Sequence, residues 1–135
     1  MSSYLLDTNV LIRHLRGERG VPALLDHWSQ SHELYISAAT WVEILAGMRP
    51  HEEKVTMHLL NSMTTLSVNK FIADRAGRMI YTHARKGFQV SFPDALIAAT
   101  SLEHDLTLVT TNVRHFAPLL GEQVTALASH LPSAT

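Results

Sequence analysis

Short apolar segments alternate with longer helical segments along almost the whole chain. Strand-like segments fall at residues 3–6, 33–37, 64–68 and 106–110, with a further candidate at 123–127. Helical patterns occupy residues 8–16, 22–30, 38–48, 50–61, 69–86 and 92–102. Strands separated by helices pair in parallel, because each helical crossover returns the chain to the same edge of the sheet. The alternation therefore predicts a three-layer α/β domain, with a mostly parallel central sheet of about five short strands flanked by helices.

The length of the chain suits one domain. At 135 residues it can bury about two thirds of the surface that its unfolded form would expose. It contains no internal repeat, linker or low-complexity segment. We therefore expect one domain over residues 1–127, followed by a frayed tail, rich in Ser, Pro and Ala, over residues 128–135.

Composition limits the cellular compartment and the kinds of site that we expect. The sequence has no cysteine, which excludes a disulfide framework and any thiolate metal site. No apolar stretch approaches the roughly 20 residues of a membrane span, and the N-terminus lacks the basic and apolar regions of a secretory signal. We expect a cytoplasmic protein with no membrane contact. The net charge of -1 leaves nucleic-acid binding open, because a basic patch can lie on one face of a neutral protein.

Two aspartates stand at the starts of predicted helices. Asp7 ends the first apolar segment, and Asp94 follows Pro93 in the first turn of the most apolar helix. Each could serve only its helix, because aspartate is a good N-cap and the helix dipole favours a negative charge there by about 0.3 to 1 kcal/mol. Open parallel sheets, however, bind ligands beyond the carboxyl ends of their strands, where Asp7 falls. Asp94 has no cation among its helical neighbours, and a partly buried carboxylate is costly without a partner.

A glutamate lies inside a helix that is otherwise apolar or small. Glu43 is off the core face formed by Trp41, Ile44, Leu45 and Met48, and its neighbours one turn away are small and not basic. A solvated helix face would normally carry longer polar side chains. Small neighbours instead leave room for another group to approach the carboxylate.

These three acids predict a cation site. Asp7, Glu43 and Asp94 all lack a basic partner nearby in the sequence. Carboxylates that gather at one place repel one another unless a cation compensates their charge. Mg²⁺ or Mn²⁺ is the natural choice, since these ions take carboxylates and water and need neither Cys nor His.

Three motifs resemble a known family. The stretches "LLDTNVLI", "WVEILAG" and "FPDALIAAT" are similar, in order and spacing, to those of PIN-domain ribonucleases, and specifically to VapC-type toxins of toxin-antitoxin modules. The resemblance implies a Mg²⁺- or Mn²⁺-dependent endoribonuclease toxin with Asp7, Glu43 and Asp94 as metal ligands. It also implies an RNA substrate, inhibition by a cognate antitoxin and a homodimer.

One motif departs from the family pattern. A fourth acid usually follows the late strand, in a "T-x-[DN]-x-x-[DEH]-F" stretch, whereas this chain has "TTNVRHF". Asn112 stands at the candidate catalytic position and His115 at the second one. Asn112 can offer a carbonyl oxygen or hold a water but adds no charge, which puts a second metal in doubt. Thr8, Asn9 and Thr110 or Thr111 are placed to hydrogen-bond the acids, although threonine is common at strand ends.

Basic residues give a weaker signal. Arginines near helical spacing, or following the motifs, could bind RNA phosphates, although such a stripe is more often a solvated face. These candidates are Arg13, Arg75, Arg78, Arg85 and Arg114. The nine histidines form no recognisable zinc motif.

Three alternatives compete with the nuclease interpretation. A phosphatase of the haloacid dehalogenase type would need a second Asp two residues after Asp7, where Asn9 stands. A metal-independent ribonuclease would need a pair of histidines as acid and base, and the spacing nominates none. A degenerate PIN domain that binds RNA or protein without cleavage remains open, because Asn112 replaces the usual acid.

Overall fold

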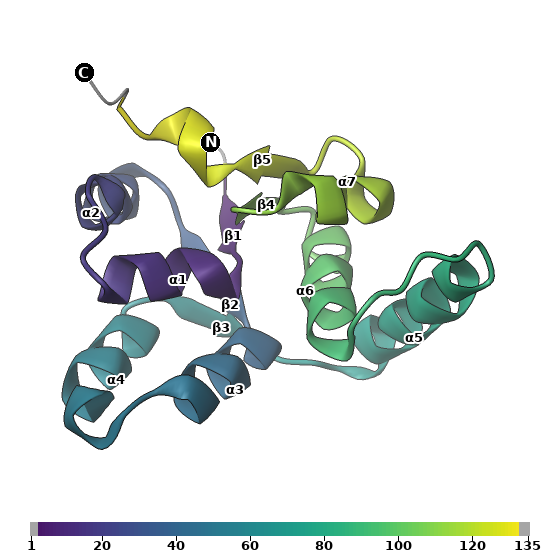
Figure 1. The fold of residues 1–135 in the computed structure, drawn as a ribbon, viewed down its shortest axis with the longest axis horizontal. Coiled ribbons are helices and arrows are strands. Elements are labelled where there is room, and N and C mark those ends of the chain that lie inside the picture. Colours follow the sequence, from purple (N-terminus) through teal and green to yellow (C-terminus); the bar gives the residue numbers. More distant parts are fainter. Residues whose placement is uncertain (1–2, 133–135) are drawn as a thin grey trace.

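The computed structural model describes residues 3–132, which form a five-stranded parallel sheet between two layers of helices (Figure 1). The strands are β1 (Tyr4–Leu6), β2 (Leu34–Ser37), β3 (Thr64–Leu66), β4 (Thr107–Thr110) and β5 (Val124–Ala126). The α-helices are α1 (Thr8–Leu15), α2 (Val21–Ser31), α3 (Ala38–Gly47), α4 (Glu53–Asn61), α5 (Lys70–Ala84), α6 (Phe92–Glu103) and α7 (Val113–Leu120). Two 3₁₀ helices, η1 (Pro50–Glu52) and η2 (Leu127–His130), complete the fold. The predicted three-layer α/β architecture is confirmed.

The strand order places a change of direction at β1. The order is β3-β2-β1-β4-β5, so the chain first moves outward from β1 and then returns to its other side. All four strand pairs are parallel, and Leu6 of β1 lies opposite Val109 of β4. The carboxyl ends of β1, β2 and β4 therefore meet at one edge of the sheet, where open parallel sheets bind their ligands.

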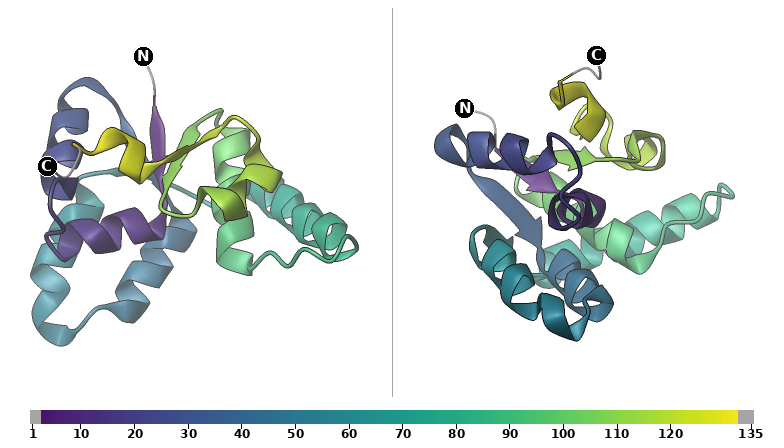
Figure 2. Two further views of the ribbon diagram at one scale, coloured as in Figure 1. Left: turned by 45° about the horizontal axis from the view of Figure 1, so that its top comes forward. Right: turned by 60° about the vertical axis from the view of Figure 1, so that its left-hand side comes forward.

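Alternate residues of the central strands belong to two separate hydrophobic cores. Leu5 and Leu108 are fully buried against α5, α6 and α7, whereas Leu6 and Val109 are fully buried against α1, α2, α3 and α4. Successive side chains of a strand point to opposite faces of the sheet. A parallel sheet that is covered by helices on both faces therefore needs apolar residues at consecutive strand positions. Figure 2 shows the two helical layers on either side of the strands.

The structure differs from the sequence-based expectation in two segments. Helix α7 was not predicted, because Pro118 interrupts a short pattern that would otherwise place Phe116 and Leu120 on one buried face. Residues 128–130, expected in a frayed tail, belong to η2, and Leu131 packs against the core that contains Leu127. Residues 133–135 of that expected tail lie outside the described residues. Among residues 3–132, no helix combines the length and the apolar character needed to cross a membrane.

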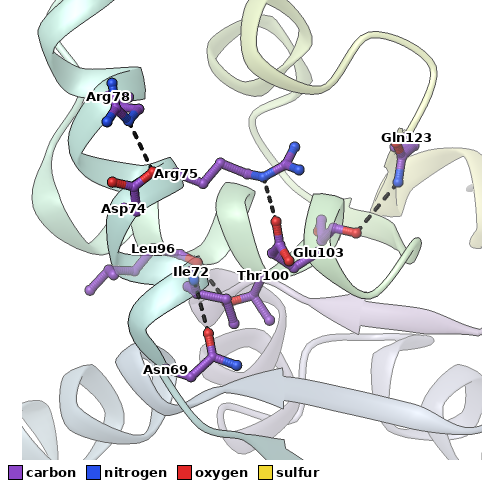
Figure 3. Close-up of polar contacts among 10 residues, drawn as sticks. Asn69, Ile72, Asp74, Arg75, Arg78, Leu96, Thr100, Glu103 and Gln123 are labelled. Atoms are coloured by element: carbon purple, nitrogen blue, oxygen red, sulfur yellow. Dashed lines mark hydrogen bonds and ion pairs between the residues drawn. The ribbon is translucent and has the colours of Figure 1, made fainter.

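Helix α5 depends on a side-chain cap at its start. The Asn69 side chain accepts a hydrogen bond from the Ile72 backbone N–H at 2.9 Å (Figure 3). We expect Asn69→Ala to lower the free energy of unfolding by about 1 kcal/mol, because it leaves that N–H without its partner. Urea denaturation measures the loss. An unchanged free energy of unfolding would contradict a stabilising role for this cap.

Candidate active site

Asp7 serves both as a helix cap and as a member of the acidic site. Its backbone N–H donates to the Val109 carbonyl at 2.9 Å, which extends the β1–β4 pairing by one residue. Its Oδ1 accepts from the Thr8 backbone N–H at 2.8 Å, and its Oδ2 accepts from the Thr110 hydroxyl at 2.6 Å. The two alternatives left open by the sequence, capping and chemistry, are therefore compatible, because both oxygens keep lone pairs that these donors do not use.

The environment of Asp7 opposes its negative charge. The residue is only 4% exposed. Burial raises the pKa of Asp7 to about 6, and the nearby charges of Asp94 and Glu43 add to the rise. The hydrogen bonds from Thr110 and Thr8 act in the opposite direction without cancelling the effect of burial. The charge that Asp7 carries at neutral pH therefore lacks full compensation within the chain.

A pair of threonine hydroxyls orients Glu43. The Thr8 hydroxyl donates to Glu43 Oε1 at 2.6 Å, and Thr8 Oγ1 lies 3.1 Å from Thr40 Oγ1. A hydroxyl has one proton, so once Thr8 donates to the carboxylate, Thr40 must donate to Thr8. The polar chain from Thr40 through Thr8 to Glu43 holds this carboxylate next to the one that follows β1.

Helix α6 brings Asp94 to the same place. Its backbone N–H lies 3.3 Å from the hydroxyl of the N-cap residue Ser91, so Asp94 occupies the first turn as expected. Its Oδ2 lies 2.9 Å from His115 Nε2 of α7, a distance typical of an ion pair when the imidazole is protonated. The histidine nitrogen does not meet the geometry of a hydrogen bond to this oxygen. His115 therefore flanks Asp94 by proximity rather than by an aligned hydrogen bond.

The three acids share one recess. Its volume is about 240 Å³, and its lining residues are Asp7, Thr8, Asn9, Ile12, Glu43, Asp94, Asn112, His115 and Phe116. Asn112 precedes α7 without capping it through its side chain, and its backbone N–H donates to Thr110 Oγ1 at 3.0 Å. Thr110 therefore links Asp7 to the segment that carries Asn112. Among residues 3–132, neither Lys nor Arg lines this recess.

The recess offers the right donors for a hard cation but is not a closed metal cage. Carboxylate and amide oxygens are the ligands that Mg²⁺ and Mn²⁺ prefer. As they stand, no three acidic, histidine or cysteine side chains within residues 3–132 are grouped closely enough to hold a metal ion. Mg²⁺ usually takes only one or two carboxylates and keeps several waters, so this open arrangement fits a partly hydrated ion.

Most of the arginines singled out from the sequence are occupied elsewhere. Arg75 pairs with Glu103 of α6 at 2.8 Å, and Arg78 pairs with Asp74 at 2.9 Å (Figure 3). Arg13 pairs with Glu18 at 2.9 Å, and the Arg85 guanidinium lies 3.8 Å from the centre of the Tyr81 ring. None of these arginines, nor Arg114, lines the acidic recess. RNA binding by these five arginines therefore stays a prediction, and it would take place outside the recess.

The sequence did not reveal several members of the site. Thr40 belongs to the core-facing part of α3, and only the folded structure shows that its hydroxyl reaches Thr8. Ile12 and Phe116 supply the apolar part of the recess. Of the suggested threonines, Thr110 contacts Asp7, whereas Thr111 is exposed and does not line the recess.

Comparison with known proteins assigns the fold to a family. The family model described as "PIN domain" matches residues 4–117, which include all three acids and Asn112. The chain belongs to the PIN-domain family. Ribonuclease VapC10 of Mycobacterium tuberculosis is 38% identical over 112 residues, covering 83% of this chain and 84% of that protein. Ribonuclease VapC1 of Rickettsia felis is 27% identical over 133 residues, covering 93% of this chain and 96% of that protein.

Solved structures agree with this PIN-domain assignment. A toxin-antitoxin complex from Klebsiella pneumoniae has a chain that is 31% identical, with a TM-score of 0.72 and coverage of 91% of this chain and 96% of that chain. A DNA-bound VapBC from Salmonella typhimurium gives a TM-score of 0.81 at 23% identity, covering 93% of this chain and 98% of that chain. Both structures support the fold, and the first is a toxin-antitoxin complex.

Proposed function

We propose that this PIN-domain protein is an endoribonuclease toxin that hydrolyses phosphodiester bonds in RNA with a divalent metal ion, Mg²⁺ or Mn²⁺. The observation that carries the proposal is the meeting of Asp7, Glu43 and Asp94 in one recess lined by neither Lys nor Arg. VapC relatives are named ribonucleases, and such nucleases generally use divalent metal ions. The proposal therefore joins the chemistry of this site to the activity named for its relatives.

Each residue of the recess has a defined task in this proposal. Asp7, Glu43 and Asp94 would hold a partly hydrated metal ion, in part through its waters, and the ion would supply an activated water and neutralise charge on the leaving oxygen. Thr110 and the Thr8 backbone N–H fix the plane of the Asp7 carboxylate. The Thr8 hydroxyl fixes Glu43. Such partners of metal ligands commonly govern ligand orientation.

Asn112 and His115 distinguish this site from one with a fourth acid. The Asn112 amide can orient a water through its carbonyl oxygen or its N–H groups, but it adds no charge to hold a second ion. His115 lies beside Asp94 and limits the freedom of that carboxylate. These substitutions support a site that depends chiefly on Asp7, Glu43 and Asp94.

A cognate antitoxin is the partner in this proposal. The similar structures from Klebsiella pneumoniae and Salmonella typhimurium are a toxin-antitoxin complex and a DNA-bound VapBC. We propose that an antitoxin covers or distorts the acidic recess of this chain.

A homodimer is also part of the proposal, and the exposed side chains of Val42, Phe71 and Phe92 offer apolar surface for it. Light scattering of the antitoxin-free protein measures that association.

Cleavage of a mixed pool of structured RNA tests the function. Antitoxin-free protein is incubated with Mg²⁺ or Mn²⁺, and in parallel with EDTA. Cleavage should require the metal, and expression without the antitoxin should arrest growth. Cleavage that is indifferent to EDTA would contradict a metal-dependent site.

A binding-only PIN domain is the second candidate, favoured by Asn112 in place of an acid. It predicts that metal-loaded protein binds RNA without shortening it and that expression leaves growth unchanged. Gel analysis of the RNA and growth curves from the same preparations separate the two candidates.

A further inference from the structure

A groove adjoins the acidic recess. Its volume is about 490 Å³, and it lies between α1, α3 and the segment formed by η1 and α4. Ile12 and Glu43 line both the groove and the recess. A polymer whose reacting bond lies at the acids can therefore continue directly into this groove.

Two free cations line the groove. Arg16 and Arg49 are exposed, and within residues 3–132 neither guanidinium has an acidic partner within ion-pairing distance. The groove also carries two carboxylates, and both accept from neutral donors rather than from a guanidinium: Glu43 accepts from the Thr8 hydroxyl, and Glu52 accepts from the Arg49 backbone N–H at 2.7 Å. The two arginines thus remain available to a ligand, unlike the paired arginines Arg75 and Arg78.

Residues of α1 connect the recess to Arg16. Asn9, Ile12 and Arg16 follow the i, i+3, i+7 spacing of α1, and Asn9 lines the recess while Arg16 lines the groove. Seven residues of helix span about 10 Å. On α3, Gly47 lines the groove one turn after Glu43, and a Cβ at Gly47 would meet nothing within 4 Å. The passage between the acids and the cations is therefore open.

We infer that this groove holds the RNA backbone next to the scissile bond, with Arg16 and Arg49 binding its phosphates. The inference rests on the proposed ribonuclease function and names the surface that receives the substrate. RNA must bring phosphates to a recess of like charge, so neighbouring cations are needed to offset the repulsion. Arg16 and Arg49 supply them, whereas Arg75 and Arg78 of α5 are paired with Glu103 and Asp74.

Binding of a labelled, mixed-sequence single-stranded RNA in EDTA tests the inference. EDTA prevents metal-dependent cleavage during the measurement. The double variant Arg16→Ala, Arg49→Ala should bind about tenfold more weakly at moderate salt, and the slope of log affinity against log salt should fall by about 1.4, because each lost phosphate contact on a single strand removes about 0.7. The variant Arg16→Lys, Arg49→Lys should retain most of the affinity.

The matched control removes the same charge from another surface. Arg75→Ala, Arg78→Ala should leave affinity and salt slope within about twofold of wild type, because both cations are already paired. A second variant, Gly47→Phe, adds bulk to the groove without changing charge. It should weaken RNA binding while circular dichroism and urea denaturation show an intact fold.

The possible failures are distinguishable. If wild-type protein cleaves RNA and the Arg16/Arg49 variant binds and cleaves RNA equally well, the groove inference is wrong and the ribonuclease proposal stands. If that variant keeps RNA affinity but loses capture by the co-expressed antitoxin, the groove receives protein, which also overturns the inference. If wild-type protein neither binds nor cleaves RNA, the proposed function fails and the inference fails with it.

Discussion

The Asp7→Asn variant is expected to cleave RNA more than about 100-fold more slowly than the wild-type protein. Mutation of a residue that only orients a metal ligand commonly lowers metal affinity or activity by about 10- to 100-fold, and Asp7 is proposed as a ligand itself. Asparagine keeps the size of the side chain and an oxygen for the Thr8 backbone N–H, but it removes the negative charge that would hold the cation. Initial rates on a fixed RNA, at saturating Mg²⁺ or Mn²⁺, measure the loss.

Asp74→Asn provides the matched control for this substitution. Asp74 is also an aspartate on a helix, but it is exposed and pairs with Arg78 on α5, outside the recess. The control should keep the wild-type rate. The proposed role of Asp7 is wrong if the folded Asp7→Asn protein retains a third or more of the wild-type rate and still arrests growth fully.

The convergence of the acids could be predicted because it follows from topology. Asp7 directly follows β1 and Glu43 belongs to the helix that follows β2, and parallel strands bring such positions to one edge of the sheet. The apolar pattern of residues 92–102 likewise predicted the helix that carries Asp94. The match of one motif to each of these elements gave the family, which the comparison with the PIN-domain model confirmed.

The hydrogen-bond network and the arginine partners could not be predicted from the sequence. The bond between Thr110 and Asp7 joins residues 103 positions apart, and Arg75 pairs with Glu103 across 28 positions. Such contacts depend on how each helix is rotated and translated on the sheet, which periodicity does not specify. The position of His115 depends on α7, and this helix was not predicted because Pro118 lies within its short pattern. Long-range packing therefore decides details that local patterns leave open.

The pH dependence of stability should show that Asp7 destabilises the metal-free fold. Its pKa is raised from 3.8 to about 6, so the folded state holds this proton more tightly than the unfolded state does. The stabilisation from protonated Asp7 is therefore complete below about pH 4 and is lost as the pH rises through 6. Since one pKa unit corresponds to about 1.4 kcal/mol, the loss is at most about 3 kcal/mol.

Asp7→Asn should remove that loss. In EDTA at pH 7 to 8, urea denaturation should give the variant a free energy of unfolding about 1 to 3 kcal/mol higher than that of wild type. The difference should shrink towards zero near pH 4, where Asp7 is neutral. Asp74→Asn is the control for removal of a carboxylate outside the recess. A difference that stays constant or grows as the pH falls would contradict burial of the Asp7 charge. Adding Mg²⁺ or Mn²⁺ should stabilise only proteins that retain Asp7, because an ion that binds the native state alone shifts unfolding by mass action.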